Sequence, residues 1–589
     1  MTKKEKEKQP DKVNFEDLNS VFENNLKIYN QYLESFKNVG TIQNNFPSFT
    51  ANIPNTNNFT INDLSNLIAP TMTKMMESLK NFQIGVQQNP KTYFDQLNKW
   101  VSQIASLNFY FVTKASGGAA NPVVLEEKTD KRFSNEEWKS NLFFDFIKQF
   151  YLISTNFLNN LIENVEFKDP KDKRLMQFYL KQLNSALSPS NFAFTNPEVL
   201  KKTVDEKGNN LAKGYENYKK DFEKHPNKLF IQQSKAGEFE IGKNLATTKG
   251  KVIFKNNLFE LIQYDCTTDQ QYAKPMLVIP PFINKYYIMD LNDKKSMMKY
   301  LVDKKLNTFL ISWKNPDASS RNISFKEYIE DGVLEALRVT CEKTGSNTAN
   351  IASYCVGGTL ASLALAYLKV VPNKYKISSA TYFASLIDFE DPGEIGIFIT
   401  EEQIASIENQ MKKTGYFDGK DMAAAFNFLR PADLYWNYVV NNYLLGNEPT
   451  AFDMLHWNSD STRLPEKMHS EYLRCMYLNN LVVKNKYKIG DVEIDLSKID
   501  TPMFAVATTE DHIAPWRSVY QGLNAYNSHI NFVLSNSGHI AGIIQGTENK
   551  PGKLHFYTKK FEKGKTQDEW FDSTKKVEGS WWPIWISWL

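Results

Sequence analysis

The sequence predicts an α/β protein in which a mostly helical N-terminal domain precedes a domain built on a parallel β-sheet. Its 589 residues exceed what one ordinary hydrophobic core holds, so two domains are expected. The first two hundred residues carry apolar side chains at helical spacing and show little β-type alternation. From about residue 250 onward, short β-rich runs alternate with helical stretches, which is typical of a parallel sheet with right-handed crossovers.

The predicted N-terminal domain covers residues 1–200 and has a ragged N-terminus. Residues 15–36 and 136–165 place apolar side chains on one helical face, whereas residues 44–60 are rich in Asn, Pro and Thr and suit a loop. We interpret the Met and Phe side chains of this domain as core residues, with a partner-binding surface as the alternative.

The predicted second domain covers residues 201–589. Helices are expected at residues 324–344, an amphipathic stretch with Gly345 just past its end, and at residues 359–371. Its strands are predicted at eight β-rich runs, which are residues 251–257, 259–265, 276–283, 308–315, 349–356, 379–389, 503–512 and 531–539.

The span between two of these strands, residues 389–503, is far longer than an ordinary crossover connection. It contains aromatic and helical segments such as residues 433–446. We therefore predict an insertion at about residues 390–475 that lies over the carboxyl ends of the strands as a cap.

Charge and cysteine usage exclude several classes of function. Lys and Arg number 70 against 67 Asp and Glu, and the net charge of +3 gives no reason to expect a nucleic-acid partner. The four cysteines lack a CxxC pair and regular spacing, so neither a metal site nor a disulfide framework is predicted. No secretory signal is visible, and no apolar run reaches the ~18 residues of a transmembrane segment. We expect a reducing cytoplasm, where a thiol stays free.

A nucleophile elbow is predicted at residues 353–357, whose sequence is SYCVG. A nucleophile on a tight strand-to-helix turn needs small residues two places to either side, because larger side chains would collide there. Ser353 and Gly357 are small, and a helix that begins after Cys355 would stabilise a thiolate. The elbow indicates an α/β-hydrolase fold, and a buried core cysteine beside a glycine turn is the alternative.

An acid and a histidine should follow the nucleophile in chain order, at the ends of later strands. Asp511 lies near the end of one predicted strand, and His539 ends the next, beside a glycine. Taken alone, Asp511 would also suit the N-cap of a helix, and His539 would also suit an ordinary loop position. His512 is interpreted as structural, because neighbouring side chains at a strand end point in opposite directions.

The chemistry of a cysteine triad gives each of these residues a role. His539 would remove the proton of the Cys355 thiol, and Asp511 would orient His539 and stabilise its cation. In a second half-reaction His539 would deprotonate a hydroxyl acceptor. The oxyanion needs two backbone N–H donors, and we expect one from Val356 and one from the loop after the strand at 276–283, near Ile283 and Asn284.

A cysteine in place of a serine favours acyl transfer over hydrolysis. An acyl group that moves from a thioester to cysteine remains a thioester, so it stays activated for a further acceptor. A cap that excludes water would strengthen this preference.

Eight ordered blocks extend from about residue 280 to the C-terminus: SYCVGGT (353–359), PPFINKYYIMDL (280–291), SWKNPDAS (312–319), LRPADLYWNYVV (429–440), LHWNSDSTRLP (455–465), EDHIAPW (510–516), SGHIAG (537–542) and GSWWPIW (579–585). In these blocks the sequence resembles the polyhydroxyalkanoate (poly-3-hydroxybutyrate) synthases, class I single-subunit type. In this family the five-residue elbow around the nucleophile usually begins with glycine, where this chain has Ser353. We expect the serine to cause modest strain in the turn and not a loss of activity. The first two hundred residues match only in broad character.

The resemblance implies an enzyme that polymerises (R)-3-hydroxyacyl-CoA, usually the 3-hydroxybutyryl thioester, into a polyester with release of CoA. No cofactor is expected beyond this CoA thioester substrate. The resemblance implies that Cys355 carries the acyl group or growing polyester chain, that His539 is the base, and that Asp511 helps to activate the acceptor 3-hydroxyl. It also implies a homodimer, a mobile cap, and a place at the surface of cytoplasmic polyester granules, with granule-associated proteins as candidate partners.

The resemblance also bears on the tryptophans. Trp457 is expected to support the cap and the dimer surface rather than to touch substrate. The C-terminal SWWPIWISWL segment is expected to pack against the catalytic domain, with a membrane or granule anchor as the alternative.

Two other functions stay open at this point. A thioesterase or polyester depolymerase on the same frame would yield free hydroxy acid and no polymer. A granule-binding protein with a vestigial triad would bind granules without covalent labelling of Cys355 by a saturated acyl-CoA analogue. The elbow and the complete triad count against the second alternative.

Overall fold

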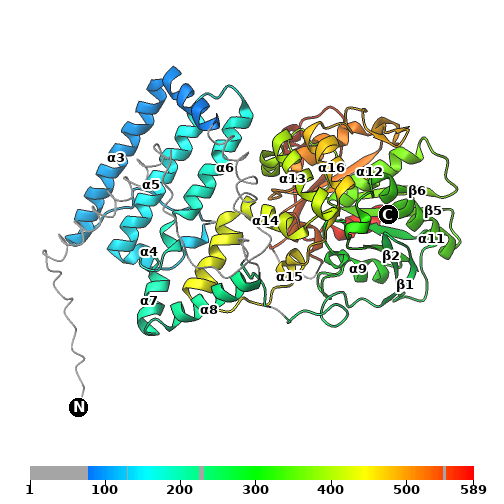
Figure 1. The fold of residues 1–589 in the computed structure, drawn as a ribbon, viewed down its shortest axis with the longest axis horizontal. Helices are drawn as coiled ribbons and strands as arrows, with labels where there is room; N and C mark the ends of the chain where they lie inside the picture. Colours follow the sequence, from blue (N-terminus) through cyan, green and yellow to red (C-terminus); the bar gives the residue numbers. More distant parts are fainter. Residues whose placement is uncertain (1–76, 129, 225–230, 236, 548–551) are drawn as a thin grey trace, which may run out of the picture. The chain divides into compact units, whose positions relative to one another are not determined.

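The computed structural model describes residues 77–589 except 129, 225–230, 236 and 548–551 (Figure 1). The chain divides into two compact units, Met1–Leu64 and Ser65–Leu589, and the description below concerns the second. The helix predicted at residues 15–36 and the loop predicted at 44–60 lie outside the described residues.

The first part of the described chain is helical, as predicted. α3 (Pro90–Ala115) packs against α5 (Leu142–Asn164), and α5 packs against α6 (Pro170–Ala186) (Figure 1). α7 (Pro197–Asp205) and α8 (Asn209–Lys224) follow. α3, α6 and α7 each begin with proline after an Asn or Asp whose side chain accepts a backbone N–H group of the first turn. This combination is a strong helix start.

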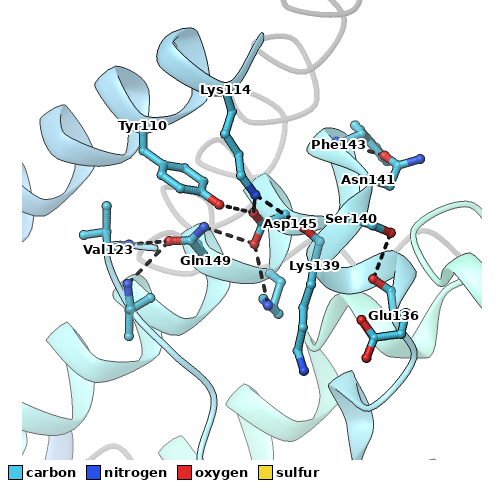
Figure 2. A network of polar contacts seen from close by, with 12 residues as sticks. Tyr110, Lys114, Val123, Glu136, Lys139, Ser140, Asn141, Phe143, Asp145 and Gln149 are labelled. Carbon is cyan, nitrogen blue, oxygen red and sulfur yellow. Dashed lines mark hydrogen bonds and ion pairs between the residues drawn. The ribbon is translucent and has the colours of Figure 1, made fainter. Parts of the chain in front are cut away.

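A buried polar network joins α5 to α3 and to the loop between them (Figure 2). Asp145 accepts hydrogen bonds from the phenol of Tyr110 at 2.5 Å and from Nε2 of Gln149 at 3.1 Å. Nζ of Lys114 lies 3.4 Å from the same carboxylate, and Gln149 accepts the backbone N–H of Val123 at 2.7 Å. Because polar groups that leave water need partners, this network fixes how the loop after α3 crosses α5.

The second part contains a ten-stranded sheet in the order β1-β2-β4-β3-β5-β6-β11-β12-β13-β14. Each of the eight predicted runs overlaps one of these strands, so all eight are confirmed. The strands are β1 (Gly250–Lys255), β2 (Phe259–Tyr264), β3 (Met276–Ile279), β4 (Thr308–Trp313), β5 (Thr348–Tyr354), β6 (Lys376–Phe383), β11 (Met503–Thr508), β12 (Ile530–Ser535), β13 (His555–Lys560) and β14 (Lys576–Glu578).

The six central strands, from β4 to β12, are parallel, but the sheet as a whole is mixed. β2 pairs antiparallel with β4 and with β1, and β13 pairs antiparallel with β12 and with β14. The prediction of a parallel sheet is therefore wrong at both edges. Only residues 256–258 separate β1 from β2, and so short a connection permits only a hairpin. β14 is a short edge strand of three exposed residues, and β13 beside it ends in two lysines, so both give little hydrophobic signal.

Both faces of the sheet are covered. Leu277 and Ile279 of β3 point into one apolar cluster, and Met276 and Val278 point into another. This alternation places a core on each side, as parallel strands require. α12 (Val356–Leu368) belongs to the first core, and almost all of its residues are buried.

The helix predicted at residues 324–344 is confirmed, although its middle is irregular. It consists of α10 (Phe325–Glu327), the π-helix η5 (Tyr328–Leu334) and α11 (Glu335–Thr344). Gly345 has φ 68° and ends the helix in the left-handed conformation that glycine adopts without strain.

Between β6 and β11 the chain forms a mostly helical insertion, which is the predicted cap. One of its first elements, η6 (Gly393–Phe398), contacts α6: the rings of Phe398 and Phe178 pack edge-to-face at 5.2 Å. Nζ of Lys181 also lies 2.7 Å from Oε1 of Glu394. The domain borders at about residue 200 and at about residues 390–475 stay predictions. The main cap helices are α13 (Glu401–Thr414), α14 (Gly419–Leu429), α15 (Asp453–Ser459), α16 (Glu466–Glu471) and the π-helix η9 (Tyr472–Leu478). No helix in the described part of the chain has the length and apolar character needed to cross a bilayer.

Candidate active site

Cys355 lies on a sharp turn between β5 and α12. Its backbone has φ 53° and ψ −128°, a conformation that costs free energy in any residue except glycine. The N–H of Cys355 donates to the carbonyl of Phe383 at 2.8 Å, and the N–H of Gly358 donates to the carbonyl of Cys355 at 2.9 Å. The side chain is half-buried at the start of α12. These features are those of the predicted nucleophile elbow.

The residues two places from Cys355 are small for separate reasons. A Cβ atom added to Gly357 would lie only 2.5 Å from the carbonyl oxygen of Ile279, so α12 packs directly on the end of β3. Ser353 is fully buried, and its hydroxyl donates to the carbonyl of Thr381 on the adjacent strand at 2.9 Å. A serine therefore has a hydrogen-bond partner where the family usually has glycine. Its compatibility with activity stays a prediction.

Asp511 and His539 meet beyond the carboxyl ends of β11 and β12. Nδ1 of His539 lies 2.6 Å from Oδ2 of Asp511, and both side chains are buried. The other carboxylate oxygen accepts the backbone N–H groups of Ile513 at 2.9 Å and Ala514 at 2.8 Å. The structure thus brings the predicted acid and base together, and two backbone donors fix the plane of the carboxylate.

Electrostatics connect His539 to Cys355. Burial by itself lowers the pKa of His539, but the charges of Asp511 and Cys355, with hydrogen bonds to both side chains, outweigh burial and raise this pKa. The imidazole therefore favours its cationic form beside the sulfur, where a thiolate and an imidazolium stabilise each other. All three predicted residues lie within reach of one another, and their catalytic roles stay predictions.

The predicted oxyanion donors lie on two segments. Val356 is the first residue of α12, where backbone N–H groups have no partner within the helix. Ile283 and Asn284 follow β3, and the cap holds this loop: the N–H of Thr462 donates to the carbonyl of Ile283 at 3.2 Å, and Asn284 forms a β-bridge with Ser461. Their service as oxyanion donors stays a prediction.

The cap brings two tyrosines near Cys355 that we did not predict from the sequence. Tyr472 and Tyr477, both in η9, pack edge-to-face at 5.1 Å, and Tyr477 packs against Phe389 at 4.8 Å. Burial raises the pKa of both phenols, and the charge of Cys355 contributes to each shift. Tyr472 belongs to the apolar cluster against which Cys355 and Tyr477 also pack, so the two rings add aromatic surface to the cluster that the sulfur contacts. The aromatic richness of the cap was the only sequence signal for them.

His512, next to Asp511 in the chain, has a different environment from that of His539. Burial lowers the pKa of His512 to about 4, with Asp511 opposing this effect and Arg430 and His539 adding to it. The ring is therefore neutral near pH 7. Its interpretation as a structural residue stays a prediction.

The C-terminal tryptophans pack beneath the histidine loop. The indole N–H groups of Trp581 and Trp582 donate to the carbonyls of Gly542 and Ile543, each at 3.0 Å. These carbonyls belong to α18 (Ala541–Ile544), which begins two residues after His539. The expectation that the C-terminal segment packs against the catalytic domain is confirmed.

Trp457 is also buried, in α15 of the cap. Its indole N–H donates to the carbonyl of Lys285 at 2.7 Å, in the loop after β3. This contact agrees with the predicted support of the cap, whereas a part in a dimer surface stays a prediction.

The chain is similar to known proteins over most of its length. Residues 129–301 match the Poly-beta-hydroxybutyrate polymerase (PhaC) N-terminus, and residues 274–544 match the alpha/beta hydrolase fold. A poly(3-hydroxyalkanoate) polymerase of Methylorubrum extorquens is 42% identical over 502 residues, covering 85% of this chain and 82% of that protein. The poly(3-hydroxyalkanoate) polymerase subunit PhaC of Cupriavidus necator is 38% identical over 469 residues, covering 78% of each chain. With this identity over this length, the chain belongs to the poly(3-hydroxyalkanoate) polymerase family.

Proposed function

We propose that this chain polymerises (R)-3-hydroxyacyl-CoA, with 3-hydroxybutyryl-CoA as its main substrate, through a covalent thioester on Cys355. The observation that carries the proposal is the pairing of His539 with Asp511 at 2.6 Å beside a cysteine on a strained elbow. The names of the relatives, which are poly(3-hydroxyalkanoate) polymerases, support a polyester as the product.

In the first half-reaction, the sulfur of Cys355 attacks the carbonyl carbon of the substrate thioester. The backbone N–H groups of Val356 and the loop after β3 hold the resulting oxyanion. The bond between this carbon and the CoA sulfur then breaks, and the CoA thiolate takes the proton from His539. One thioester replaces another, so the acyl group stays activated.

In the second half-reaction, neutral His539 accepts the proton of an acceptor hydroxyl. The hydroxyl oxygen attacks the acyl carbon on Cys355, an ester bond forms, and the carbon–sulfur bond breaks to restore the thiolate. Asp511 supports the activation of this hydroxyl through His539. Apolar cap side chains such as Tyr472 and Tyr477 reduce the access of water, which would otherwise compete as acceptor. No cofactor beyond the CoA thioester is required.

We also propose, on the support of the family alone, that the chain acts as a homodimer at the surface of cytoplasmic polyester granules. The growing polyester is its second ligand, and granule-associated proteins are its candidate partners.

The test is an assay of the purified chain with 3-hydroxyacyl-CoAs of graded length, in which released CoA and insoluble polymer are both measured. Cys355→Ala should abolish both signals, whereas Cys266→Ala, at an exposed cysteine, should preserve them. Turnover in Cys355→Ala would contradict the proposal. Release of free hydroxy acid without polymer would favour the thioesterase or depolymerase, and failure of a saturated acyl-CoA analogue to label Cys355 would favour the binding protein.

A further inference from the structure

Tyr354, the residue before Cys355, contacts His539 in two ways. It is the last residue of β5, and its side chain is fully buried. The phenol O–H donates to the backbone carbonyl of His539 at 3.1 Å. The rings of Tyr354 and His539 are also stacked, with centroids 5.3 Å apart and planes 30° apart.

The two contacts restrain different parts of the histidine. The hydrogen bond holds the main chain of the loop after β12, in which Ser537 has φ 79°, a conformation that is strained for serine. The stacked ring sets the plane of the imidazole, whose Nδ1 faces Asp511. Without both restraints, rotation of the His539 side chain would separate it from Asp511 or from Cys355.

Tyr354 also suits the charge of its neighbour. Burial raises the pKa of Tyr354 well above its ordinary value, and the charges of Cys355 and Asp511 raise it further, so the phenol stays neutral. The face of a neutral aromatic ring attracts a cation such as the imidazolium of His539. The titratable groups around His539 are therefore Asp511, Cys355, His512 and this neutral phenol.

We propose that Tyr354 is a positioning residue for His539, which it holds between Asp511 and Cys355 through the phenol-to-carbonyl hydrogen bond and the ring stack. The inference rests on the triad proposed above. The geometry of the elbow does not require a tyrosine before the nucleophile, because the turn needs only small residues two places from the cysteine. The proposed role therefore gives a separate reason for a tyrosine at this position.

Two substitutions separate the two contacts. Tyr354→Phe keeps the stacked ring and removes only the hydrogen bond, so kcat should fall roughly 3- to 10-fold. Tyr354→Leu removes the hydrogen bond and the ring together, so the fall should be on the order of 100-fold. KM for 3-hydroxybutyryl-CoA should change little, because both substitutions alter the placement of the base and not the surface that binds the thioester.

Tyr526→Phe provides a matched control. Tyr526 is buried and stacked on Tyr382 with centroids 6.2 Å apart, and its phenol pairs with Ser362 at 2.7 Å. It therefore loses the same kind of hydrogen bond, but in the apolar cluster on the other face of the sheet from Tyr354. This variant should lose thermal stability without a change in kcat.

The decisive measurement is the rate of Cys355 alkylation by iodoacetamide from about pH 5 to about pH 10, together with kcat, KM and the thermal midpoint of the full chain. A well-placed imidazolium keeps the thiolate populated at low pH. Both Tyr354 variants should therefore need a higher pH for rapid alkylation, Tyr354→Leu more so, whereas Tyr526→Phe should match the unsubstituted chain.

The outcomes distinguish a failure of the role proposed for Tyr354 from a failure of the triad on which it depends. If both Tyr354 variants lose only thermal stability, and keep the kcat and the alkylation profile of the unsubstituted chain, then Tyr354 is a packing residue and the inference is overturned. If Cys355→Ala retains turnover, the triad itself fails, and the role of Tyr354 falls with it.

Discussion

The carboxylate of Asp511 faces the imidazole of His539 with one oxygen and the backbone with the other. Oδ2 lies 2.6 Å from Nδ1 of the histidine, while Oδ1 accepts the N–H groups of Ile513 and Ala514. Because these donors hold Oδ1, the carboxylate cannot turn away from the histidine without losing two hydrogen bonds. The geometry of the acid is therefore set by a tight turn that follows β11.

This division of oxygens predicts the effect of Asp511→Asn. The amide oxygen should stay with the two backbone donors, which places the NH₂ group against Nδ1 of His539 and forces the wrong tautomer. We expect kcat for CoA release to fall roughly 10³- to 10⁴-fold with the fold intact. Asp495→Asn is the matched control, because Asp495 also accepts a backbone N–H, that of Ser497 at 3.0 Å. Near-normal turnover in Asp511→Asn would remove the acid from the triad.

A second prediction concerns Ser353, whose hydroxyl donates to Thr381. Ser353→Gly should lower the free energy of unfolding by about 1 kcal/mol, through the lost hydrogen bond, and leave kcat within about threefold. Ser353→Val should inactivate the enzyme, because a branched side chain would crowd the elbow. Denaturant unfolding and CoA release measure the two effects, and an inactive Ser353→Gly would show that the hydroxyl does more than fit the turn.

A third prediction concerns Trp582, whose indole donates to Ile543 in the short helix after His539. Trp582→Phe keeps an aromatic ring and removes this bond, so the histidine loop should loosen. We expect a loss of about 1 kcal/mol in stability and a several-fold fall in kcat. Trp585→Phe is the comparison, because Trp585 donates to Thr381 in β6 instead. Equal effects of the two substitutions on kcat would argue against a specific support of the loop.

A fourth prediction concerns acid stability and His469. Burial lowers the pKa of His469 to about 3, its ring stacks on Phe417 at 4.5 Å, and Nδ1 has no hydrogen-bond partner among the described residues. The folded state keeps this histidine neutral, while the unfolded chain takes up a proton below about pH 6.5. Stability should therefore fall as the pH drops below this value, by about 1.4 kcal/mol per pH unit for one such group.

His469→Phe should remove this part of the pH dependence. The difference in free energy of unfolding between the variant and the unsubstituted chain should grow in favour of the variant from about pH 6.5 down to about pH 4. His529→Gln, at an exposed histidine, should follow the unsubstituted chain. The raised pKa of His539 acts in the opposite sense: its contribution is complete below about pH 6.5 and is lost as the pH rises toward its folded value. Parallel curves for His469→Phe and the unsubstituted chain would contradict the prediction.

The features that could be predicted from the sequence are local. The elbow at Cys355 was predictable because strand, turn and helix are adjacent in the chain, and the acid and base because each follows an apolar strand. Tyr354 could not be predicted, because its bond to His539 joins residues 185 positions apart. The same holds for Tyr472, which approaches Cys355 only through the folding of the cap. Of the antiparallel strands, β1 and β2 were predicted as β-rich runs, whereas β13 and β14 escaped prediction. β14 has only three residues, all exposed, and β13 ends in two lysines.

The pairing of β6 with β11, in which Met503 lies opposite Ala380, joins two strands that the entire cap separates. Closing a loop of such length costs on the order of 4 kcal/mol in chain entropy beyond a constant term, so this pairing should form late. During synthesis, Cys355 leaves the ribosome well before Asp511 and His539, the acid and base proposed to act with it. In a nascent chain, Cys355 would thus be open to oxidation before it can act as a catalyst. During refolding, activity should appear when β11 pairs with β6 and not when the helices form.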